Sequence, residues 1–226
     1  MKLLAIETAT EACSAALYID GEVSERCQVE PRRHAELILS MMDELLAEAG
    51  FKLSQLDALA FGRGPGSFTG VRIATGVIQG AAFGADLPVV PVSTLAALAQ
   101  SYFRETGARK ILPAFDARMQ ELYWAAYEVG DEGLATGIGQ EQVAAPADVI
   151  LPEGDNWHGV GTGWATYEEQ LSQRMGKALD AIKGDQLCSA HDIALLGVAG
   201  FNQGQSVSAE KALPIYLRDK VAKRPG

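Results

Sequence analysis

The sequence predicts an α/β protein made of two lobes, each a mixed sheet flanked by helices. In the first half, three strand-like segments joined by short turns are followed by helices and strands in alternation. A similar pattern begins again near Lys110, and no low-complexity linker separates the two halves. We therefore expect two lobes in close contact, an N-terminal lobe at residues 1–106 and a smaller, acidic C-terminal lobe at 107–226.

The first half opens with a strand meander. Asp20-Gly21 is a strong hairpin signal, and strands joined by connections this short must pair antiparallel. Gly50 is a natural stop for the first predicted helix. In chain order we expect strands at Lys2–Thr8, Ala12–Asp20 and Glu22–Glu30, a helix at Arg33–Ala49, a strand at Leu56–Gly62, a helix at Thr69–Gly84, a strand at Leu87–Val92 and a helix from Ser93 to Glu105.

The second half repeats the opening of the first. In both halves the first strand ends in a carboxylate followed by a short turn, Glu7-Thr8-Ala9 in one and Asp116-Ala117-Arg118 in the other. This parallel predicts a duplicated β-β-β unit. We expect strands at Ile111–Asp116 and Glu121–Val129, an extended stretch after Gly130–Gly133, a strand at Trp157–Gly161, and helices at Thr166–Met175 and Ala190–Phe201.

Composition limits the classes of function. The 226 residues are 48% hydrophobic and 21% charged, which is typical of a globular protein. Lys and Arg total 19 against 29 Asp and Glu, a formal net charge of −10. Strong binding to nucleic acid requires many neutralised phosphates, so unaided binding to RNA or DNA is disfavoured. Residues 140–192 carry much of the acidity, whereas the tail after Pro214 is basic.

The sequence also predicts a cytoplasmic protein without a membrane span. Its three cysteines have no Cys-x-x-Cys spacing, which favours buried thiols in a reducing compartment over disulfides or a zinc site. Glu7 interrupts the N-terminal apolar run too early for a signal peptide. No apolar stretch approaches the roughly 20 residues that cross a bilayer.

A glycine-rich loop, Gly62 to Gly70, is the most specific motif. Glycines on both sides of a proline, between a strand and a helix, allow a close approach of the backbone to another group. The loop is either a tight structural turn, the favoured interpretation, or a cradle for phosphate at a helix N-terminus. It has neither the Gly-Lys-Ser/Thr of a Walker A loop nor Gly-x-Gly-x-x-Gly. Its candidate residues are Gly64, Pro65, Gly66, Ser67, Thr69 and Arg72.

The two carboxylates at the strand ends suggest a degenerate nucleotide site. Paired carboxylates commonly position magnesium and its water beside a nucleotide, although each can equally accept a hydrogen bond within its own turn. Neither is followed by a glycine that lets phosphate approach, and Gly161-Thr162-Gly163 is only a weak motif for contact with adenosine. The candidate residues are Glu7, Thr8, Asp116, Gly161 and Gly163.

No catalytic or metal-ligating residue is predicted. The histidines, His34, His158 and His191, lack His-x-x-x-His or His-Glu-x-x-His spacing. No serine or cysteine has an adjacent base in a recognisable order, so the sequence offers no nucleophile.

The helix Arg33–Ala49 has a wider apolar face than packing on one sheet requires. The excess predicts either a core helix or a second apolar contact, formed with the small-residue helix Thr69–Gly84 as a subunit interface. The candidate interface residues are His34, Leu37, Ile38, Met41, Met42, Leu45, Ile73 and Val77.

Four segments together resemble the TsaB branch, also called YeaZ, of the TsaD/TsaB (Gcp/YeaZ) family. The resemblance is strong over the first 130 residues, and the closing Pro214–Arg218 is also similar. The segments are Leu3 to Ser14, Arg33-His34-Ala35-Glu36, Gly64-Pro65-Gly66-Ser67-Phe68-Thr69-Gly70-Val71-Arg72 and Asp116 to Tyr123.

The resemblance implies an actin-like ATPase fold of the Hsp70 and sugar-kinase type. It also implies a non-catalytic role in forming threonylcarbamoyladenosine at position 37 of tRNAs that read ANN codons. The partner would be TsaD, bound through the first two helices, with TsaE joining the pair and tRNA contacted only indirectly. A homodimer is expected when the chain is alone, and no cofactor is required, with residual binding of ATP or ADP and magnesium left open.

An enzyme is the alternative interpretation. An ATP-dependent kinase or carbamoyltransferase would use Glu7 and Asp116 with magnesium. The missing His-x-x-x-His motif of TsaD relatives and the missing glycines after both carboxylates favour the non-catalytic interpretation.

Overall fold

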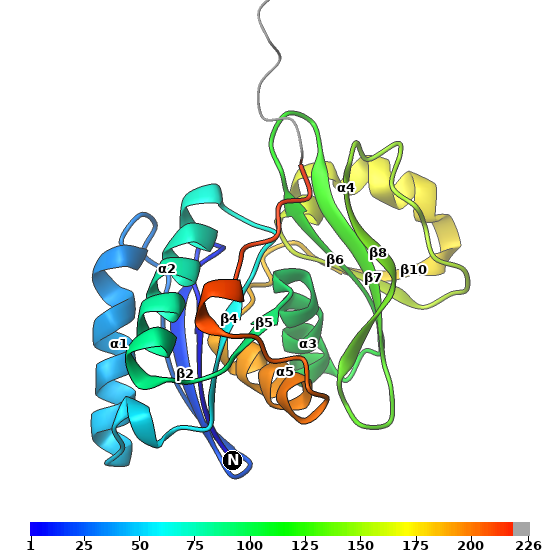
Figure 1. Cartoon of the computed structure of the whole chain (residues 1–226). Helices are drawn as coiled ribbons and strands as arrows, with labels where there is room; N and C mark the ends of the chain where they lie inside the picture. The colour runs from blue at the N-terminus through cyan, green and yellow to red at the C-terminus, as the bar shows by residue number, and fades with distance from the viewer. Residues whose placement is uncertain (219–226) are drawn as a thin grey trace, which may run out of the picture.

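The computed structural model describes residues 1–218 and contains two five-stranded mixed sheets (Figure 1). The first has the strand order β3-β2-β1-β4-β5 and the second β10-β9-β6-β7-β8, so β6 occupies in the second sheet the place of β1 in the first. The predicted α/β fold with a duplicated β-β-β unit is confirmed. The first half comprises β1 (Lys2–Glu7), β2 (Cys13–Ile19), β3 (Glu22–Gln28), α1 (His34–Ala49), η1 (Leu53–Gln55), β4 (Ala58–Gly62), α2 (Phe68–Ala85), β5 (Val89–Val92) and α3 (Thr94–Thr106).

The second half repeats this plan with fewer helices. Its β6 pairs antiparallel with β7 and parallel with β9, as β1 pairs with β2 and β4. It comprises β6 (Lys110–Asp116), β7 (Leu122–Val129), β8 (Ala135–Ala144), β9 (Trp157–Val160), α4 (Thr162–Met175), η2 (Gly176–Ala178), β10 (Leu179–Lys183), α5 (Ala190–Asn202) and η3 (Ala209–Lys211).

The layers follow from the alternation of side chains along the strands. In β1, Leu3 and Ala5 belong to a core shared with α3, α5 and the second sheet, whereas Leu4 and Ile6 belong to the core beneath α1 and α2. Helix α4 covers the outer face of the second sheet, where Trp124 and Trp164 pack with their ring centroids 5.7 Å apart. Figure 1 shows α1 and α2 at one side of the molecule and α4 at the other.

The last part of the chain returns to the first sheet. Helix α5 packs against β1, β2 and β4, and Val207 forms a bridge with Val89 of β5. The amide of Gln79 on α2 donates a hydrogen bond to the carbonyl oxygen of Ala212, 3.0 Å away. The division at residues 106 and 107 stays a prediction, but the packing places α5 and the segment after it on the first sheet.

Two expectations for the second lobe were wrong. Helix α4 begins at Thr162 rather than Thr166, because Gly161 has a φ of +95° and starts the helix directly after β9. Strand β10 was not predicted, and it pairs parallel with β9. Within residues 1–218, no helix has the length and apolar character needed to cross a membrane. The basic residues Lys220, Lys223 and Arg224 lie outside the described residues.

Candidate functional site

The glycine-rich loop between β4 and α2 packs against the turn that follows β1. The backbone nitrogen of Ser67 donates a hydrogen bond to the carbonyl oxygen of Ala9 at 2.7 Å. A Cβ atom on Gly66 would lie 2.4 Å from that oxygen, and one on Gly70 would lie 2.0 Å from the carbonyl oxygen of Thr8. Contacts this short leave no room for a side chain, so both glycines are needed for close backbone packing.

Two further polar groups of the same loop form hydrogen bonds within the chain. The carbonyl oxygen of Gly64 accepts a hydrogen bond from the backbone nitrogen of Thr94 at 3.0 Å. The Ser67 hydroxyl caps α2 by accepting from the backbone nitrogen of Gly70 at 3.4 Å. This geometry supports the tight-turn interpretation of the loop. Of the other predicted loop residues, Pro65 is buried, whereas Thr69 and Arg72 are exposed.

Glu7 is completely buried at the end of β1. One carboxylate oxygen accepts a hydrogen bond from the backbone nitrogen of Ala9, and the other has no hydrogen-bond partner among the described residues. A Cβ on Gly62 would lie 1.7 Å from that second oxygen. Burial raises the pKa of Glu7 to about 7. The neighbouring Thr8 is also buried, and its hydroxyl donates to the carbonyl oxygen of Gly70 at 2.7 Å.

Asp116 lies at the equivalent end of β6 and bonds within its own turn. Its carboxylate accepts hydrogen bonds from the backbone nitrogen of Arg118 at 2.9 Å and from the guanidinium of the same residue at 3.2 Å. The hydroxyl of Tyr167 on α4 donates to it at 3.4 Å. In the described part of the chain, no hydrogen bond or ion pair connects Asp116 with Glu7. The second interpretation, a carboxylate that accepts hydrogen bonds in its turn, fits both residues.

Gly161 and Gly163 hold the start of α4 against β6. A Cβ on Gly161 would lie 2.5 Å from the carbonyl oxygen of Ala114, and one on Gly163 would lie 2.7 Å from the Cβ of Ala114. Neither glycine lines either of the two grooves described below. Each of the five residues of the predicted nucleotide site thus packs or forms hydrogen bonds within the chain, and none of them lines either of those two grooves.

The histidines are bonded individually and do not cluster. The Nε2 atom of His34 lies 3.0 Å from the carbonyl oxygen of Thr10. His158 lies between two polar partners. Its Nδ1 atom is 3.1 Å from the hydroxyl of Tyr102, and its Nε2 atom is 3.3 Å from the carboxylate of Asp180. Across residues 1–218, no group of three or more His, Cys, Asp or Glu side chains is placed to hold a metal ion.

A polar groove of about 970 Å³ lies between the two lobes. Glu141 of β8 lines this groove and accepts hydrogen bonds from Ser93 and, at 2.9 Å, from the hydroxyl of Tyr127. The guanidinium of Arg63 lies 3.9 Å from the same carboxylate. Burial is the main cause that raises the pKa of Tyr127, and the charge of Glu141 adds to it. Sequence reasoning missed this network because its members come from four separate segments.

The predicted interface residues on α1 are mostly buried in the isolated chain. Ile38, Met41, Met42 and Leu45 are at most 4% exposed and belong to the core between the helices and the first sheet. The selection of Ile38, Met41 and Leu45 as contact residues is therefore corrected, because they belong to the core, whereas Met42 also lines the groove described next. His34 is also buried, whereas Leu37, Ile73 and Val77 are half-buried.

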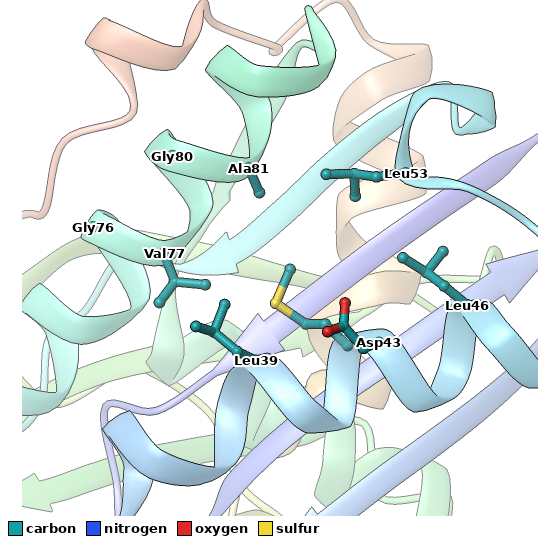
Figure 2. Close-up of a pocket in the computed structure, with 9 residues that line it drawn as sticks. Leu39, Asp43, Leu46, Leu53, Gly76, Val77, Gly80 and Ala81 are labelled. Atoms are coloured by element: carbon teal, nitrogen blue, oxygen red, sulfur yellow. The ribbon is translucent and has the colours of Figure 1, made fainter.

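The accessible apolar surface of the two helices is a groove of about 490 Å³ between α1 and α2. Figure 2 shows Leu39 and Asp43 of α1 opposite Val77 of α2, with Leu53 nearby. Leu39 is 56% exposed, and its side chain lies at the edge of the groove. The residues that line the groove are Leu39, Met42, Asp43, Leu46, Leu53, Gly76, Val77, Gly80 and Ala81.

A stripe of three glycines runs along the outer face of α2. A Cβ on Gly76, Gly80 or Gly84 would meet nothing within 4 Å. Their i, i+4, i+8 spacing places them on one side of the helix, and Phe83 beside them is 84% exposed. Leu39 of α1 and Phe83 of α2 were not among the interface residues that the sequence predicted.

Comparisons with known proteins identify relatives of this chain over its whole length. The model of a family described as TsaD, tRNA N6-adenosine threonylcarbamoyltransferase, matches residues 27–225. A protein of Escherichia coli (strain K12) named tRNA threonylcarbamoyladenosine biosynthesis protein TsaB is 43% identical, over 100% of this chain and 99% of its own length. The protein of the same name from Haemophilus influenzae is 41% identical, over 100% of this chain and 98% of its own.

Solved structures agree with the sequence comparison. YeaZ from Pseudomonas aeruginosa is 46% identical and superposes with a TM-score of 0.90, over 96% of this chain and 99% of its own. A second structure, an uncharacterized Pseudomonas aeruginosa protein described as similar to the peptidase YEAZ, is 45% identical and superposes with the same score and coverage. The chain therefore belongs to the TsaB (YeaZ) family of tRNA threonylcarbamoyladenosine biosynthesis proteins, with the two-lobed actin-like fold.

Proposed function

We propose that this chain is a non-catalytic subunit that binds and stabilises TsaD while the threonylcarbamoyl group is formed on adenosine 37 of tRNAs reading ANN codons. TsaE joins the pair, and two copies of the chain associate through the same surface when TsaD is absent. In this role the chain needs no cofactor of its own. The complex that it forms modifies tRNA in the cytoplasm.

The open glycine stripe on α2 is the observation that carries the proposal. Gly76, Gly80 and Gly84 weaken the helix that contains them, because glycine costs about 1 kcal/mol relative to alanine in a helix interior. Nothing among residues 1–218 requires them, since a Cβ on any of the three would meet open space there. A helix of another protein would gain from them, because small residues let two helix backbones approach closely. The neighbouring Leu39 and Phe83 supply exposed apolar side chains for the same contact.

The carboxylate geometry supports a role without chemistry of its own. The buried carboxylate of Glu7 packs against Gly62, and the carboxylate of Asp116 accepts hydrogen bonds from Arg118. Neither is therefore directed at a common site for a nucleotide with magnesium. The arrangement does not fit the alternative kinase or carbamoyltransferase, which needs both carboxylates beside one ligand.

Co-purification with TsaD tests the proposal most directly. We expect a stable complex, and we expect threonylcarbamoyl transfer to tRNA only when both proteins are present. Titration calorimetry of the isolated chain with ATP and magnesium addresses the alternative. Micromolar binding with turnover would favour the enzyme and contradict the proposal.

Two variants test the surface. Gly80→Leu fills the open stripe, and Leu39→Glu places a charge at the rim of the groove. Because both positions are exposed, the fold should be kept while the affinity for TsaD falls at least tenfold, about 1.4 kcal/mol. Gln173→Leu, an added leucine on the exposed face of α4, is the matched control. Met41 and Leu45 are unsuitable targets, since a charge there would be buried in the core.

A further inference from the structure

An arginine–aromatic cluster lies at the N-terminal end of α2. Phe68 and Tyr216 are 56% and 45% exposed, and their ring centroids are 6.0 Å apart. The guanidinium carbon of Arg72 lies 3.2 Å from the centroid of the Phe68 ring and 5.5 Å from that of Tyr216. Among residues 1–218, no carboxylate lies within 4.0 Å of Arg72. The cluster thus presents flat π-surfaces together with guanidinium donors that no acid of residues 1–218 occupies.

Arg218 extends this cluster to the second lobe. Its guanidinium donates to the carbonyl oxygen of Arg118 at 3.4 Å, lies 3.8 Å from the sulfur of Met119, and pairs with Glu121. Met119 is 69% exposed, and the Arg118 side chain is 87% exposed. The segment that contains Tyr216 and Arg218 therefore links the exposed Arg72 of α2 with the exposed Arg118 of the β6–β7 turn.

The β6–β7 turn is strained where it presents these side chains. Arg118, Met119 and Gln120 are three consecutive non-glycine residues with φ values of +61°, +57° and +63°. Each left-handed residue of this kind costs about 1–2 kcal/mol. Strain of this kind gathers at binding sites, where side chains must be held in a fixed direction. The turn holds Arg118 and Met119 at the surface next to Arg218.

Positive charge is concentrated at this end of an acidic chain. The sequence from Tyr216 to Gly226 contains Arg218, Lys220, Lys223 and Arg224 against the single acid Asp219, although the whole chain has a net charge of −10. Asp116 and Glu121, the acids at the two ends of the β6–β7 turn, are each already paired with an arginine. This distribution favours a polyanion over an apolar protein surface as the ligand.

We propose that the cluster of Phe68, Arg72, Met119, Tyr216 and Arg218 binds an unpaired segment of tRNA. Bases without a pairing partner stack on aromatic rings and on guanidinium planes, and Arg72 over Phe68 is already arranged in this way. The free donors of Arg72 hold phosphate, while Met119 and Tyr216 flank the stacked base. The inference rests on the proposed function, because that function makes tRNA the substrate of the complex. It differs from the expectation that only the partner contacts tRNA.

The test is tRNA binding by the assembled complex of this chain with TsaD. The probe is a fluorescein-labelled, unmodified tRNA transcript that reads an ANN codon, and fluorescence anisotropy gives its affinity. We expect Phe68→Ala and Arg72→Ala each to weaken binding about tenfold, which is the loss of one base stack. Arg72→Lys keeps the charge without the planar stack, so a loss of two- to threefold is expected. Arg109→Ala is the matched control, because Arg109 lies 5.9 Å from the Phe103 ring outside the cluster.

Pairing with TsaD is measured separately by calorimetry on the same variants. If pairing is normal and tRNA affinity equals that of the control, the inference is overturned while the proposed function stands. If the variants weaken pairing but leave the tRNA affinity of the assembled complex unchanged, the cluster contacts protein and the inference is again overturned. Failure of the unaltered chain to pair with TsaD would count against the proposed function instead. Thermal melting checks that the variants are folded, as their exposure leads us to expect.

Discussion

Two groups of glycines follow one another along the loop and helix α2, and their surroundings are opposite. A Cβ on Gly62, Gly66 or Gly70 would lie between 1.7 and 2.4 Å from another atom, whereas one on Gly76, Gly80 or Gly84 would meet nothing within 4 Å. The first group is explained by packing inside the chain. The second group is not explained by contacts among residues 1–218, although it weakens the helix, and it is therefore the basis of the proposed contact with TsaD.

The largest effect is expected when a closed glycine is substituted. Gly70→Ala would bring a methyl group 2.0 Å from the carbonyl oxygen of Thr8, and this neighbour is backbone that cannot rotate away. The start of α2 must then shift from the β1–β2 turn, which we expect to lower the free energy of unfolding by about 3 kcal/mol. Denaturant unfolding measures the change. A loss below 1 kcal/mol would show that the loop does not depend on this close approach.

A second prediction concerns the pH dependence that Glu7 imposes on the same packed region. Its folded pKa of about 7 exceeds the ordinary value of 4.5 because burial disfavours the charged form. The free energy of unfolding should therefore fall as the pH rises from about 4.5 through 7. From pH 5 to pH 8 this one group lowers the free energy of unfolding by about 2.5 kcal/mol. Each pKa unit between the folded and the ordinary value corresponds to about 1.36 kcal/mol.

Glu7→Gln removes that titration while it keeps the shape of the side chain. The variant should lose most of this pH dependence and be more stable than the unaltered chain at pH 8. Chemical unfolding at pH 5, 6, 7 and 8 gives the two profiles. Parallel profiles would mean that Glu7 is not the buried group that titrates.

Local signals predicted much of the fold, and long-range packing supplied the rest. Asp20-Gly21 marked a hairpin because turn chemistry is encoded in two residues, and their φ values of +48° and +111° agree. Strand β10 was missed because it is five residues long and follows a 3-10 turn. The placement of α5 on the first sheet had no local signal, since it depends on contacts such as that of Gly197 with Ala60.

The pair of helices proposed as the interaction surface stays a prediction, and the structure changes which of their residues are accessible. On α1 the apolar residues cover more than one stripe, and the sequence alone does not say which stripe faces the sheet. The structure turns Ile38 and Leu45 inward and leaves Leu39 exposed. On α2 the sequence indicated only a helix rich in small residues, because open space above a glycine becomes visible only when the neighbouring elements are in place.

The smallest change in stability is expected for the substitution of an open glycine on α2. Gly76→Ala adds a methyl group to the open face, so it should increase the free energy of unfolding by about 0.5–1 kcal/mol through helix propensity alone. The same methyl group separates two helix backbones that would otherwise touch, so the affinity for a partner should fall even though the isolated chain is more stable. Unfolding of the chain by itself and calorimetric titration with TsaD measure the two quantities independently. A variant that is more stable and binds TsaD as tightly as before would show that the open glycines have no role in binding. A variant that is more stable but binds TsaD less tightly would show that the glycines lower the stability of α2 in exchange for a close approach of the partner.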